Sequence, residues 1–413
     1  MKAELKSIFK NKNFGVLFIG ATLSELGTKI GYIALMVKVY QLTGNPMNLG
    51  IVAGLGLLPG LIMSLIAGVA IDRYNKKKIM IFCDIARSLV CIGILIAPSI
   101  SYIYFLVVVS AIFDQLFLPA RASMEPHILE KNELIHANSL KQSTSSFLLI
   151  VGPLLGGALI SAFNLNIAFI IDAISYLLSA FFISLMSYKY LQSEKTEKRA
   201  FSKHTQHFLK DIGEGLHYVM NNSLIKAILF FHLTITVIYS MQAPLIFAFV
   251  NEVFSAKANY AGYLFSVAGI GSFIGSLITM KIGQKTKNFN SLMLVLFFDG
   301  IMFMLFALCT KFSYSLAIFS LAGIIGTVFS IVIFSVVQEY VPAIFCGRVF
   351  SVISFISGPI GLLSIIIGAY ISKIYSVKTL FIASGIMESL IALSCFILFL
   401  PRKWNKLLKQ EMV

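Results

Sequence analysis

The fold is decided by residues 14–40, which read FGVLFIGATLSELGTKIGYIALMVKVY. A helix needs about 20 apolar residues to cross the hydrocarbon core of a bilayer, and this run is long enough. A short turn at 43–46 follows it, and a second apolar run covers 48–71. Similar runs continue almost to the end of the chain, so the sequence predicts an all-α membrane protein.

The composition agrees with a membrane location. Hydrophobic residues make up 58% of the chain and charged residues 12%, and the mean hydropathy is +0.88. Soluble domains carry about twice this share of charged residues. Lys and Arg outnumber Asp and Glu by 33 to 18, but most of them lie between the apolar runs, which argues against a nucleic-acid partner. The cysteines show no paired spacing, so we expect five free thiols, at Cys83, Cys91, Cys309, Cys346 and Cys395.

We predict twelve transmembrane helices in two pseudo-symmetric bundles of six. The longest polar interruption runs from Tyr188 to about Asn222 and divides them. The predicted parts are an N-terminal six-helix bundle at 1–188, a cytoplasmic central loop at 189–222, and a C-terminal six-helix bundle with a short cytoplasmic tail at 223–413. The predicted helices cover roughly 14–40, 48–71, 79–98, 101–119, 144–163, 165–187, 223–249, 259–281, 289–310, 313–336, 350–372 and 376–399.

Weak internal symmetry supports two related halves. Gly152-Pro153 in the fifth predicted helix has a counterpart in Gly358-Pro359 of the eleventh. Gly68, near the end of the second, similarly matches Gly275 near the end of the eighth. Parallel halves of this kind are typical of transporters, which bind their substrate near the midplane between the halves.

The distribution of lysine and arginine predicts the orientation. With the N-terminus in the cytoplasm, one side of the membrane collects the N-terminal lysines, residues 76–78 and the basic run 189–210. The other side keeps little beyond Lys38, Lys257, Lys311, Lys373 and Lys378. Basic residues concentrate on the cytoplasmic side, so we predict a multi-pass plasma-membrane protein with both termini in the cytoplasm. The first apolar run is too long for a cleaved signal peptide, and we expect it to remain as an anchor.

The sharpest local motif joins the second and third predicted helices and reads Gly68-Val-Ala-Ile-Asp72-Arg73-Tyr-Asn-Lys76-Lys77-Lys78. Gly68 allows a neighbouring helix to approach closely. Asp72 lies at a helix end, where it can accept hydrogen bonds from the N-terminus of another helix. The three lysines fit an ordinary basic turn equally well, because such turns contact anionic lipid.

This arrangement resembles the loop between helices 2 and 3 of the major facilitator superfamily, in which the Asp belongs to a charge relay that gates the cytoplasmic side. The resemblance assigns this gate to Gly68, Asp72 and Arg73, with Asp84 and Arg87 as relay partners. The corresponding stretch of the second half lacks the Asp. Three further segments are similar to the drug-antiporter branch, which includes macrolide efflux proteins and the enterobactin exporter: Pro119–Leu140, Asp211–Val219 and Gln338–Phe350.

The fifth predicted helix carries Gly152-Pro153-Leu-Leu-Gly156-Gly157. Small residues at this spacing allow close helix contact, and a proline frees a backbone carbonyl and bends the helix. The motif resembles the Gly-Pro motif of exporters in the superfamily, which importers usually lack, so the resemblance implies export. A packing motif without directional meaning is the alternative.

Charges inside the predicted helices need a reason, because an ionised group at the bilayer centre costs roughly 2.5–3.5 kcal/mol. Glu25 and Lys29 share one face of the first helix, and Asp114 lies in the fourth. The resemblance places both helices on the central cavity, so Glu25 and Asp114 are predicted to carry protons. Alternatively, Lys29 is a permanent ion-pair partner that only fixes Glu25 and its helix. Many relatives have an acidic residue just after the glycine of this helix, whereas Thr28 follows Gly27 here.

Several other polar residues lie inside predicted helices. For Asp172, Asp299 and Glu388, on the peripheral sixth, ninth and twelfth helices, we expect a hydrogen bond to a neighbouring helix. His232 lies near the position symmetric to Glu25 and is a candidate second titratable site, although a lone histidine in a span is more often structural. Candidate cavity residues on the seventh helix are His232, Tyr239 and Gln242, beside Met241.

The sequence favours a secondary transporter, namely a proton-coupled exporter of bulky amphipathic small molecules (a drug, macrolide or siderophore) by alternating access, with antibiotic resistance as a consequence. A passive or lipid translocator on the same fold is the alternative. The six histidines show no metal-ligand or nucleophile spacing, and no glycine-rich lysine loop for ATP occurs. We therefore expect no enzyme, metal or cofactor. The expected partners are the substrate, protons and membrane lipid, and the expected state is a monomer.

Overall fold

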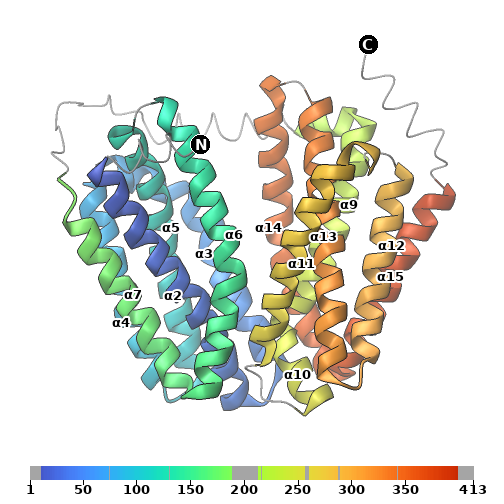
Figure 1. Cartoon of the computed structure of the whole chain (residues 1–413), viewed down its shortest axis with the longest axis horizontal. Coiled ribbons are helices and arrows are strands. Elements are labelled where there is room, and N and C mark those ends of the chain that lie inside the picture. Colours follow the sequence, from blue (N-terminus) through green and yellow to red (C-terminus); the bar gives the residue numbers. More distant parts are fainter. Residues whose placement is uncertain are drawn as a thin grey trace. The chain divides into compact units, whose positions relative to one another are not determined.

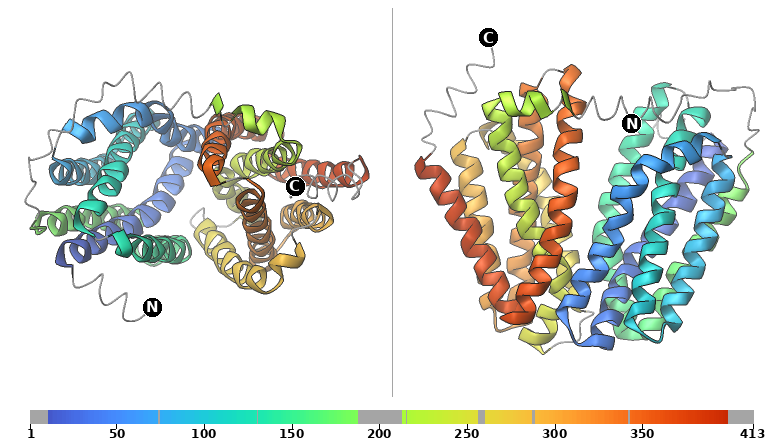
Figure 2. Two further views of the ribbon diagram at one scale, coloured as in Figure 1. Left: turned by 90° about the horizontal axis from the view of Figure 1, so that it is seen from above. Right: turned by 180° about the vertical axis from the view of Figure 1, so that it is seen from behind.

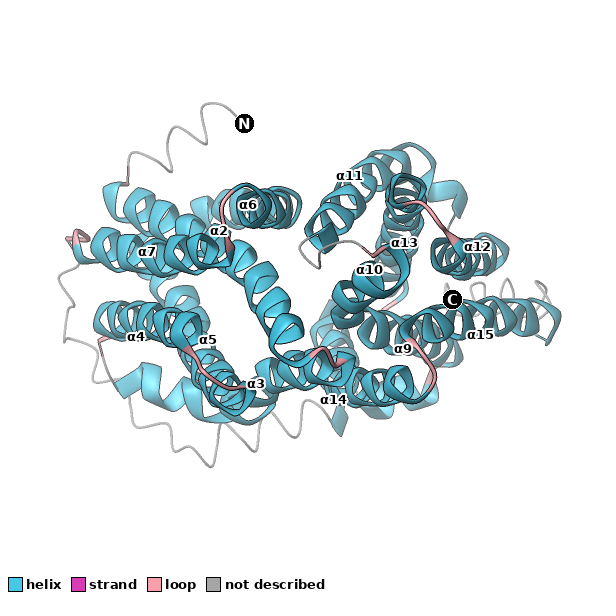
Figure 3. Cartoon of the chain, turned by 90° about the horizontal axis from the view of Figure 1, so that it is seen from below, coloured by secondary structure: helices cyan, strands magenta, loops and turns pink. Residues whose placement is uncertain are grey.

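The computed structural model describes residues 11–73, 75–129, 131–187, 213–214, 216–255, 260–286, 289–341 and 343–398, with the side chains of 61–73 and of scattered later positions outside the description. Every regular element within these residues is helical (Figure 3). Eleven described segments are long and apolar enough to cross a membrane, and a twelfth helix has a shorter apolar stretch at Pro46–Gly60. The predicted all-α membrane fold is confirmed.

Figure 1 labels the helices. The first six are α2 (Lys12–Thr43), α3 (Pro46–Arg73), α4 (Lys76–Ile96), α5 (Ile100–Ile128), α6 (Lys131–Ala162) and α7 (Leu165–Ser184). The later ones are α9 (Ser223–Gln242), η1 (Ala243–Leu245), α10 (Ile246–Phe254), α11 (Ala261–Thr286), α12 (Phe289–Leu308), α13 (Phe312–Tyr340), α14 (Ala343–Ile374) and α15 (Val377–Leu398).

Short polar residues define where several helices begin and end. Asn11, Asn75, Asn164 and Asn222 precede α2, α4, α7 and α9, and each side-chain oxygen accepts a hydrogen bond from an N–H group of the first turn. These N–H groups have no partner within a helix, so the caps stabilise the helix starts. Gly44 ends α2 with φ +57°, a left-handed conformation that glycine adopts without strain.

Two lysines hold the ends of neighbouring helices. Lys38 of α2 is buried, and its ammonium group donates to carbonyl oxygens at the end of α4. Lys77 of α4 does the same at the end of α7. The last carbonyl groups of a helix lack intrahelical partners, and a lysine satisfies them well. The distances from Nζ are 2.6 and 2.7 Å for Lys38 to Ile94 O and Leu95 O, and 2.8 Å for Lys77 to both Ser184 O and Met186 O.

Four helices extend past their predicted apolar segments. α5 continues to Ile128 and α6 begins at Lys131, where the prediction placed a loop between residues 119 and 144. α13 and α14 likewise reach Tyr340 and Ala343. Many of the added residues are polar, above all at the start of α6, where a hydropathy criterion for the bilayer does not detect a helix. Glu133 in the first turn of α6 favours this extension, because a carboxylate stabilises the positive end of a helix.

The seventh predicted helix is interrupted. α9 ends at Gln242, the 3-10 turn η1 follows, and α10 completes a single span that covers Leu224–Phe254. Pro244 lies in η1, and its missing N–H prevents an unbroken ladder of helical hydrogen bonds. The chain therefore changes its helical winding inside this span.

The chain forms two compact units, built mainly from α2–α7 (unit 1) and from α9–α15 (unit 2). In unit 1, α2 lies beside α7, and α4 packs against both α5 and α7 (Figure 2). Gly20, Gly27 and Gly31 of α2 face α7, and a Cβ atom at Gly27 would come within 2.6 Å of the Cβ atom of Ser175. Glycine is therefore required for this close approach.

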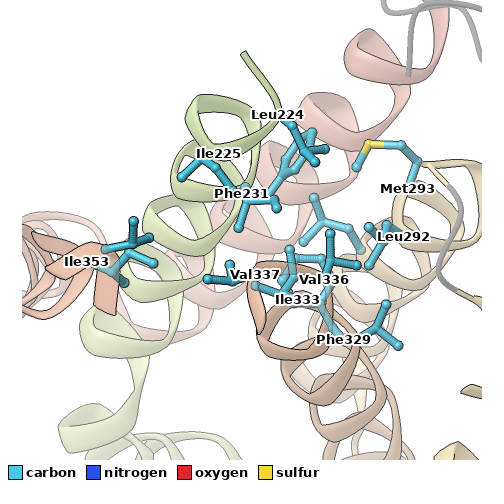
Figure 4. Packing of buried hydrophobic residues seen from close by; sticks show 14 of the residues in the cluster. Leu224, Ile225, Phe231, Leu292, Met293, Phe329, Ile333, Val336, Val337 and Ile353 are labelled. Carbon is cyan, nitrogen blue, oxygen red and sulfur yellow. The ribbon is translucent and has the colours of Figure 1, made fainter. Parts of the chain in front are cut away.

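Unit 2 has a large apolar core between α9, α12, α13 and α14. Figure 4 shows Leu224, Ile225 and Phe231 of α9 facing α13, with Leu292 and Met293 of α12 beside them. α12 also packs closely on α15, because a Cβ atom at Gly300 would lie 2.6 Å from the carbonyl oxygen of Gly385. The buried α13 residues of this core include Phe329, Ile333, Val336 and Val337.

The outer helices present apolar side chains at the protein surface. Phe82, Leu89 and Ile96 follow one another at intervals of seven along α4 and are 63%, 64% and 74% exposed. Residues at this spacing lie on one side of a helix. An exposed apolar stripe is unfavourable in water and suits contact with lipid chains, in agreement with the membrane assignment.

Candidate functional site

A buried arginine organises the polar interior of unit 1. Arg87 of α4 forms ion pairs with Asp84, one turn earlier, and with Asp114 of α5, where Nη1 lies 2.6 Å from Oδ1. Its guanidinium group also lies over the rings of Phe117 and Tyr176, 4.4 and 4.5 Å from their centroids. We call these five residues the Arg87 cluster. The predicted relay partners Asp84 and Arg87 are thus joined, and their described partner is the predicted proton carrier Asp114.

Exposure distinguishes the two carboxyl groups of the Arg87 cluster. The side chain of Asp84 is 0% exposed, whereas that of Asp114 is 38% exposed. One guanidinium group compensates one carboxylate fully, so the cluster holds an excess of one acidic group. Asp114 is therefore the carboxyl group of the cluster that is accessible from outside it.

Hydrogen bonds connect the Arg87 cluster to α2. Tyr176 of α7 and Thr28 of α2 form a hydrogen bond of 2.8 Å between their hydroxyl groups. One turn away, Cys91 Sγ donates to Asp172 Oδ2 at 3.3 Å, which confirms the expected bond from Asp172 to a neighbouring helix. Gly31 leaves the space that the Asp172 side chain occupies. Thr28 thus has a defined hydrogen-bonding partner on α7.

Glu25 lies in a different group of charges. Its Oε2 accepts a hydrogen bond from Ser145 of α6 at 3.1 Å, and Arg121 of α5 attracts it electrostatically. Arg121 also pairs with Glu125 at 3.4 Å, and Lys141 pairs with the other oxygen of Glu125. Our sequence analysis missed Glu125 and Lys141, although the i,i+4 spacing of Arg121 and Glu125 is a recognisable signal.

Within the described part of the chain no ion pair joins Glu25 to Lys29, the pairing given above as the alternative to a proton-carrier role. The reason lies in the packing of α2 on α6. The Lys29 stem occupies the space beside Gly152, where an added Cβ atom would overlap it. An i,i+4 spacing places two residues on one face, but neighbouring helices decide where the side chains point.

The Gly-Pro motif of α6 forms this helix contact. Gly152, Pro153, Gly156 and Gly157 are all buried. A Cβ atom at Gly156 would lie 3.2 Å from Ile33 of α2. The motif therefore acts in helix packing, and its predicted meaning for the direction of transport stays a prediction.

The residues of the predicted gate are described only in part. Gly68, Asp72 and Arg73 belong to the last turns of α3. Their side chains lie outside the described residues, so the gating role stays a prediction. Of the lysines that follow, Lys77 has the capping role at the end of α7 given above.

Two of the candidate cavity residues of α9 form hydrogen bonds within unit 2, and their role in lining a cavity stays a prediction. Tyr239 Oη donates to Asp299 Oδ2 of α12 at 2.9 Å, and the buried Gln242 donates from Nε2 to Ser384 Oγ of α15 at 2.6 Å. Both side chains thus satisfy polar groups of α12 and α15. His232 is half-buried, and its carbonyl oxygen accepts a hydrogen bond from Thr236.

The cysteine prediction can be checked at four positions, and Cys83, Cys91, Cys309 and Cys395 are free thiols. The side chain of Cys346 lies outside the described residues. In the part of the chain that the structure describes, no group of three or more His, Cys, Asp or Glu side chains is arranged to hold a metal ion.

Comparisons with known proteins identify efflux pumps among the relatives. The chain is 26% identical over 401 residues to the uncharacterized MFS-type transporter YfiS of Bacillus subtilis (strain 168), covering 94% of each chain. It is 23% identical to the multidrug efflux pump Tap of Mycolicibacterium fortuitum, covering 94% of this chain and 95% of Tap. It is 22% identical to macrolide efflux protein A of Streptococcus pyogenes, covering 92% of this chain and 95% of that protein.

Solved structures show the fold. The crystal structure of the nucleoside transporter NupG matches with a TM-score of 0.75 at 12% identity and covers 94% of this chain and 99% of its own. The model of one protein family, the Major Facilitator Superfamily, matches residues 17–365. The match extends over most of the sequence, so this chain belongs to the Major Facilitator Superfamily.

Proposed function

We propose that this secondary transporter is a proton-coupled exporter of bulky amphipathic small molecules. The observation that carries the proposal is the Arg87 cluster, in which two carboxyl groups share one guanidinium group and only Asp114 is exposed. The similarity to a multidrug efflux pump and to a macrolide efflux protein supports export and this class of cargo. Drugs, macrolides and siderophores all fit the class.

Protonation of Asp114 would change the cluster in a defined way. A neutral Asp114 no longer forms an ion pair, so Arg87 is left with Asp84 as its only charged partner. The guanidinium group lies over the ring of Tyr176, and the Tyr176 hydroxyl is hydrogen-bonded to Thr28 of α2. A movement of Arg87 would therefore displace Tyr176 and act on α2. Each proton that enters the cell gains about 2.3 kcal/mol per 100 mV of membrane potential, which is available to drive export.

We propose Glu25 as a second proton carrier and rank it after Asp114. Arg121 and Lys141 balance Glu25 and Glu125 in number, whereas the single guanidinium group of Arg87 faces two carboxyl groups. Glu25 nevertheless lies on α2, the same helix as Thr28. A movement of the Arg87 cluster would be transmitted to this helix through the hydrogen bond between Tyr176 and Thr28. The two roles can be separated because the groups share no described contact.

The orientation and the gate are part of the proposal. We place both termini in the cytoplasm of a plasma-membrane protein, and we assign Gly68, Asp72 and Arg73 to a cytoplasmic gate. A cysteine placed by Lys409→Cys, in a background without the five native cysteines, should escape an impermeant thiol reagent in intact cells. Labelling there would reverse the topology. Asp72→Asn should reduce transport while leaving expression unchanged.

The decisive experiment is efflux from membrane vesicles under an imposed proton gradient, with macrolides, cationic dyes and siderophores as test cargo. Wild type, Asp114→Asn, Glu25→Gln and the matched control Glu252→Gln are compared, since Glu252 is exposed on α10. We expect gradient-driven flux in wild type and control, and its loss in Asp114→Asn. Flux of cargo or lipid that ignores both the gradient and Asp114→Asn would support a passive or lipid translocator instead.

A further inference from the structure

We propose that Asp299 and Glu388 form a proton-binding site in unit 2, in which two buried carboxyl groups share one proton. Asp299 lies on α12 and Glu388 on α15, and they are 1% and 0% exposed. The inference deepens the proposed function, since a shared proton adds a second coupling site to a proton-driven transporter. Its existence can nevertheless be measured without any transport.

Close packing brings the two carboxyl groups together. The backbones of α12 and α15 approach at Gly300 and Gly385, one residue after Asp299 and three before Glu388. Asp299 and Glu388 flank this contact, and their carboxyl groups act on one another electrostatically. An ionised carboxylate only accepts hydrogen bonds, so two neighbouring carboxyl groups can bond to one another only when one of them carries a proton.

The surrounding donors do not replace that proton. Tyr239 Oη donates to one oxygen of Asp299. Among the described residues, no protein N–H or O–H group donates to the other oxygen of Asp299 or to either oxygen of Glu388. Burying an ionised carboxylate without donors is very unfavourable, and burying two side by side is more so. A single proton between them relieves both problems.

No basic side chain faces the pair from the described helices around it. The groups that act on the two carboxyls are each other and Tyr239 of α9. α13 has no charged residue between Phe312 and Ile333. Glu252 of α10 and Lys373 of α14 are exposed at the surface. The pair therefore lacks the countercharge that Arg87 supplies in unit 1.

The pair is connected to the break in the seventh span. Tyr239 and Gln242 lie one turn apart on α9, and they bond to Asp299 of α12 and to Ser384 of α15. Gln242 is also the last residue of α9, directly before η1. Release of the shared proton would leave two carboxylates that repel one another, and this repulsion would act on the partners of Tyr239 and Gln242.

Infrared spectroscopy of the purified full-length protein in lipid nanodiscs near neutral pH tests the proposal. A protonated carboxyl group has a C=O stretching band that an ionised one lacks, and exchange into heavy water identifies it. We compare wild type, Glu388→Gln, the double variant Asp299→Asn with Glu388→Gln, and the control Glu252→Gln. In Glu388→Gln the new amide donates to Asp299 in place of the proton, so the fold has no reason to change.

We expect Glu388→Gln and the double variant each to lose one carboxyl equivalent of this band, and the control to lose none. A loss of zero or two equivalents in the double variant would overturn the inference, as would removal of the band by sodium ions at constant pH. Tyr239→Phe should shift the band without removing it. Absence of gradient-driven export would leave the band in place, so the two proposals fail separately.

Discussion

Both units bury acidic side chains, but they stabilise them by opposite means. In unit 1, Arg87 pairs with both Asp84 and Asp114, and one of these carboxyl groups is partly exposed. In unit 2, Asp299 and Glu388 are sealed, and their described neighbours supply a tyrosine hydroxyl instead of a cation. A guanidinium group favours the ionised form of a neighbouring carboxyl group, whereas two carboxyl groups without a cation favour binding a proton. The countercharge therefore decides which chemistry each unit supports.

Removing the countercharge from unit 1 should have the largest effect on stability. Arg87→Met leaves the buried Asp84 carboxylate uncompensated, and we expect the free energy of unfolding to fall by about 3–5 kcal/mol. Denaturant titration of the detergent-solubilised protein measures this change. Addition of Asp84→Asn to Arg87→Met should restore most of the loss. Wild-type stability of Arg87→Met alone would show that the cluster is not held by charge, and the exposed Lys226→Gln is the control.

Two close helix contacts, one in each unit, should differ in their tolerance of a methyl group. A Cβ atom at Gly300 meets the backbone oxygen of Gly385 at 2.6 Å, whereas a Cβ atom at Gly20 of α2 meets nothing nearer than 3.2 Å. Gly300→Ala should therefore cost about 1–3 kcal/mol. Gly20→Ala should cost clearly less, in the same denaturant titration. Equal losses would mean that α12 can move away from α15 as easily as α2 adjusts.

The two buried tyrosines provide a finer comparison. Tyr239→Phe removes the donor to Asp299, and a buried carboxyl oxygen without its donor costs about 1–3 kcal/mol. Tyr176→Phe removes only the bond to Thr28, which keeps its bond of 2.8 Å to Ser24 O, so about 0.5–1.5 kcal/mol is expected. Thermal unfolding of the two variants side by side checks the order. A reversed order would indicate that the Arg87 cluster depends on the Tyr176 hydroxyl.

The smallest effect is expected at Lys29. Since Lys29 does not pair with Glu25, Lys29→Gln should change the free energy of unfolding by about 0.5 kcal/mol or less. Breaking a buried ion pair would instead cost about 3–5 kcal/mol. Denaturant titration distinguishes these values easily. A large loss would restore the pairing that the spacing of Glu25 and Lys29 suggested.

The parts of this molecule that depend on local sequence were predictable. Apolar length identified the membrane-spanning helices, and the break between Thr43 and Pro46 follows from a Gly44 that ends α2. The polar ends of α5 and α6 were not detected, because hydropathy responds to the bilayer and not to the helix. Helix capping by Asn11, Asn75 and their equivalents depends on local geometry that apolar length does not report.

The polar partners were less predictable, because helices far apart in the sequence create them. Asp84 and Arg87 were correctly grouped, since they lie one turn apart on α4. Asp114 joins them only through the packing of α4 on α5. Two helices lie between Asp299 and Glu388 in the sequence, so no local spacing of residues indicates that the two side chains lie close together. Each was expected to bond to a neighbouring helix, but the sequence alone did not suggest that their carboxyl groups act on each other.

Lys38 and Lys77, which cap the ends of α4 and α7, have different roles during membrane insertion and in the folded protein. A membrane protein acquires its orientation during insertion, when Lys38 and Lys77 have no folded helix ends to bind and act as free charges. After folding, both ammonium groups are occupied by carbonyl oxygens. Counting lysines therefore predicts how the chain is threaded through the bilayer. The same count overestimates the positive charge that the finished protein offers to lipid phosphates.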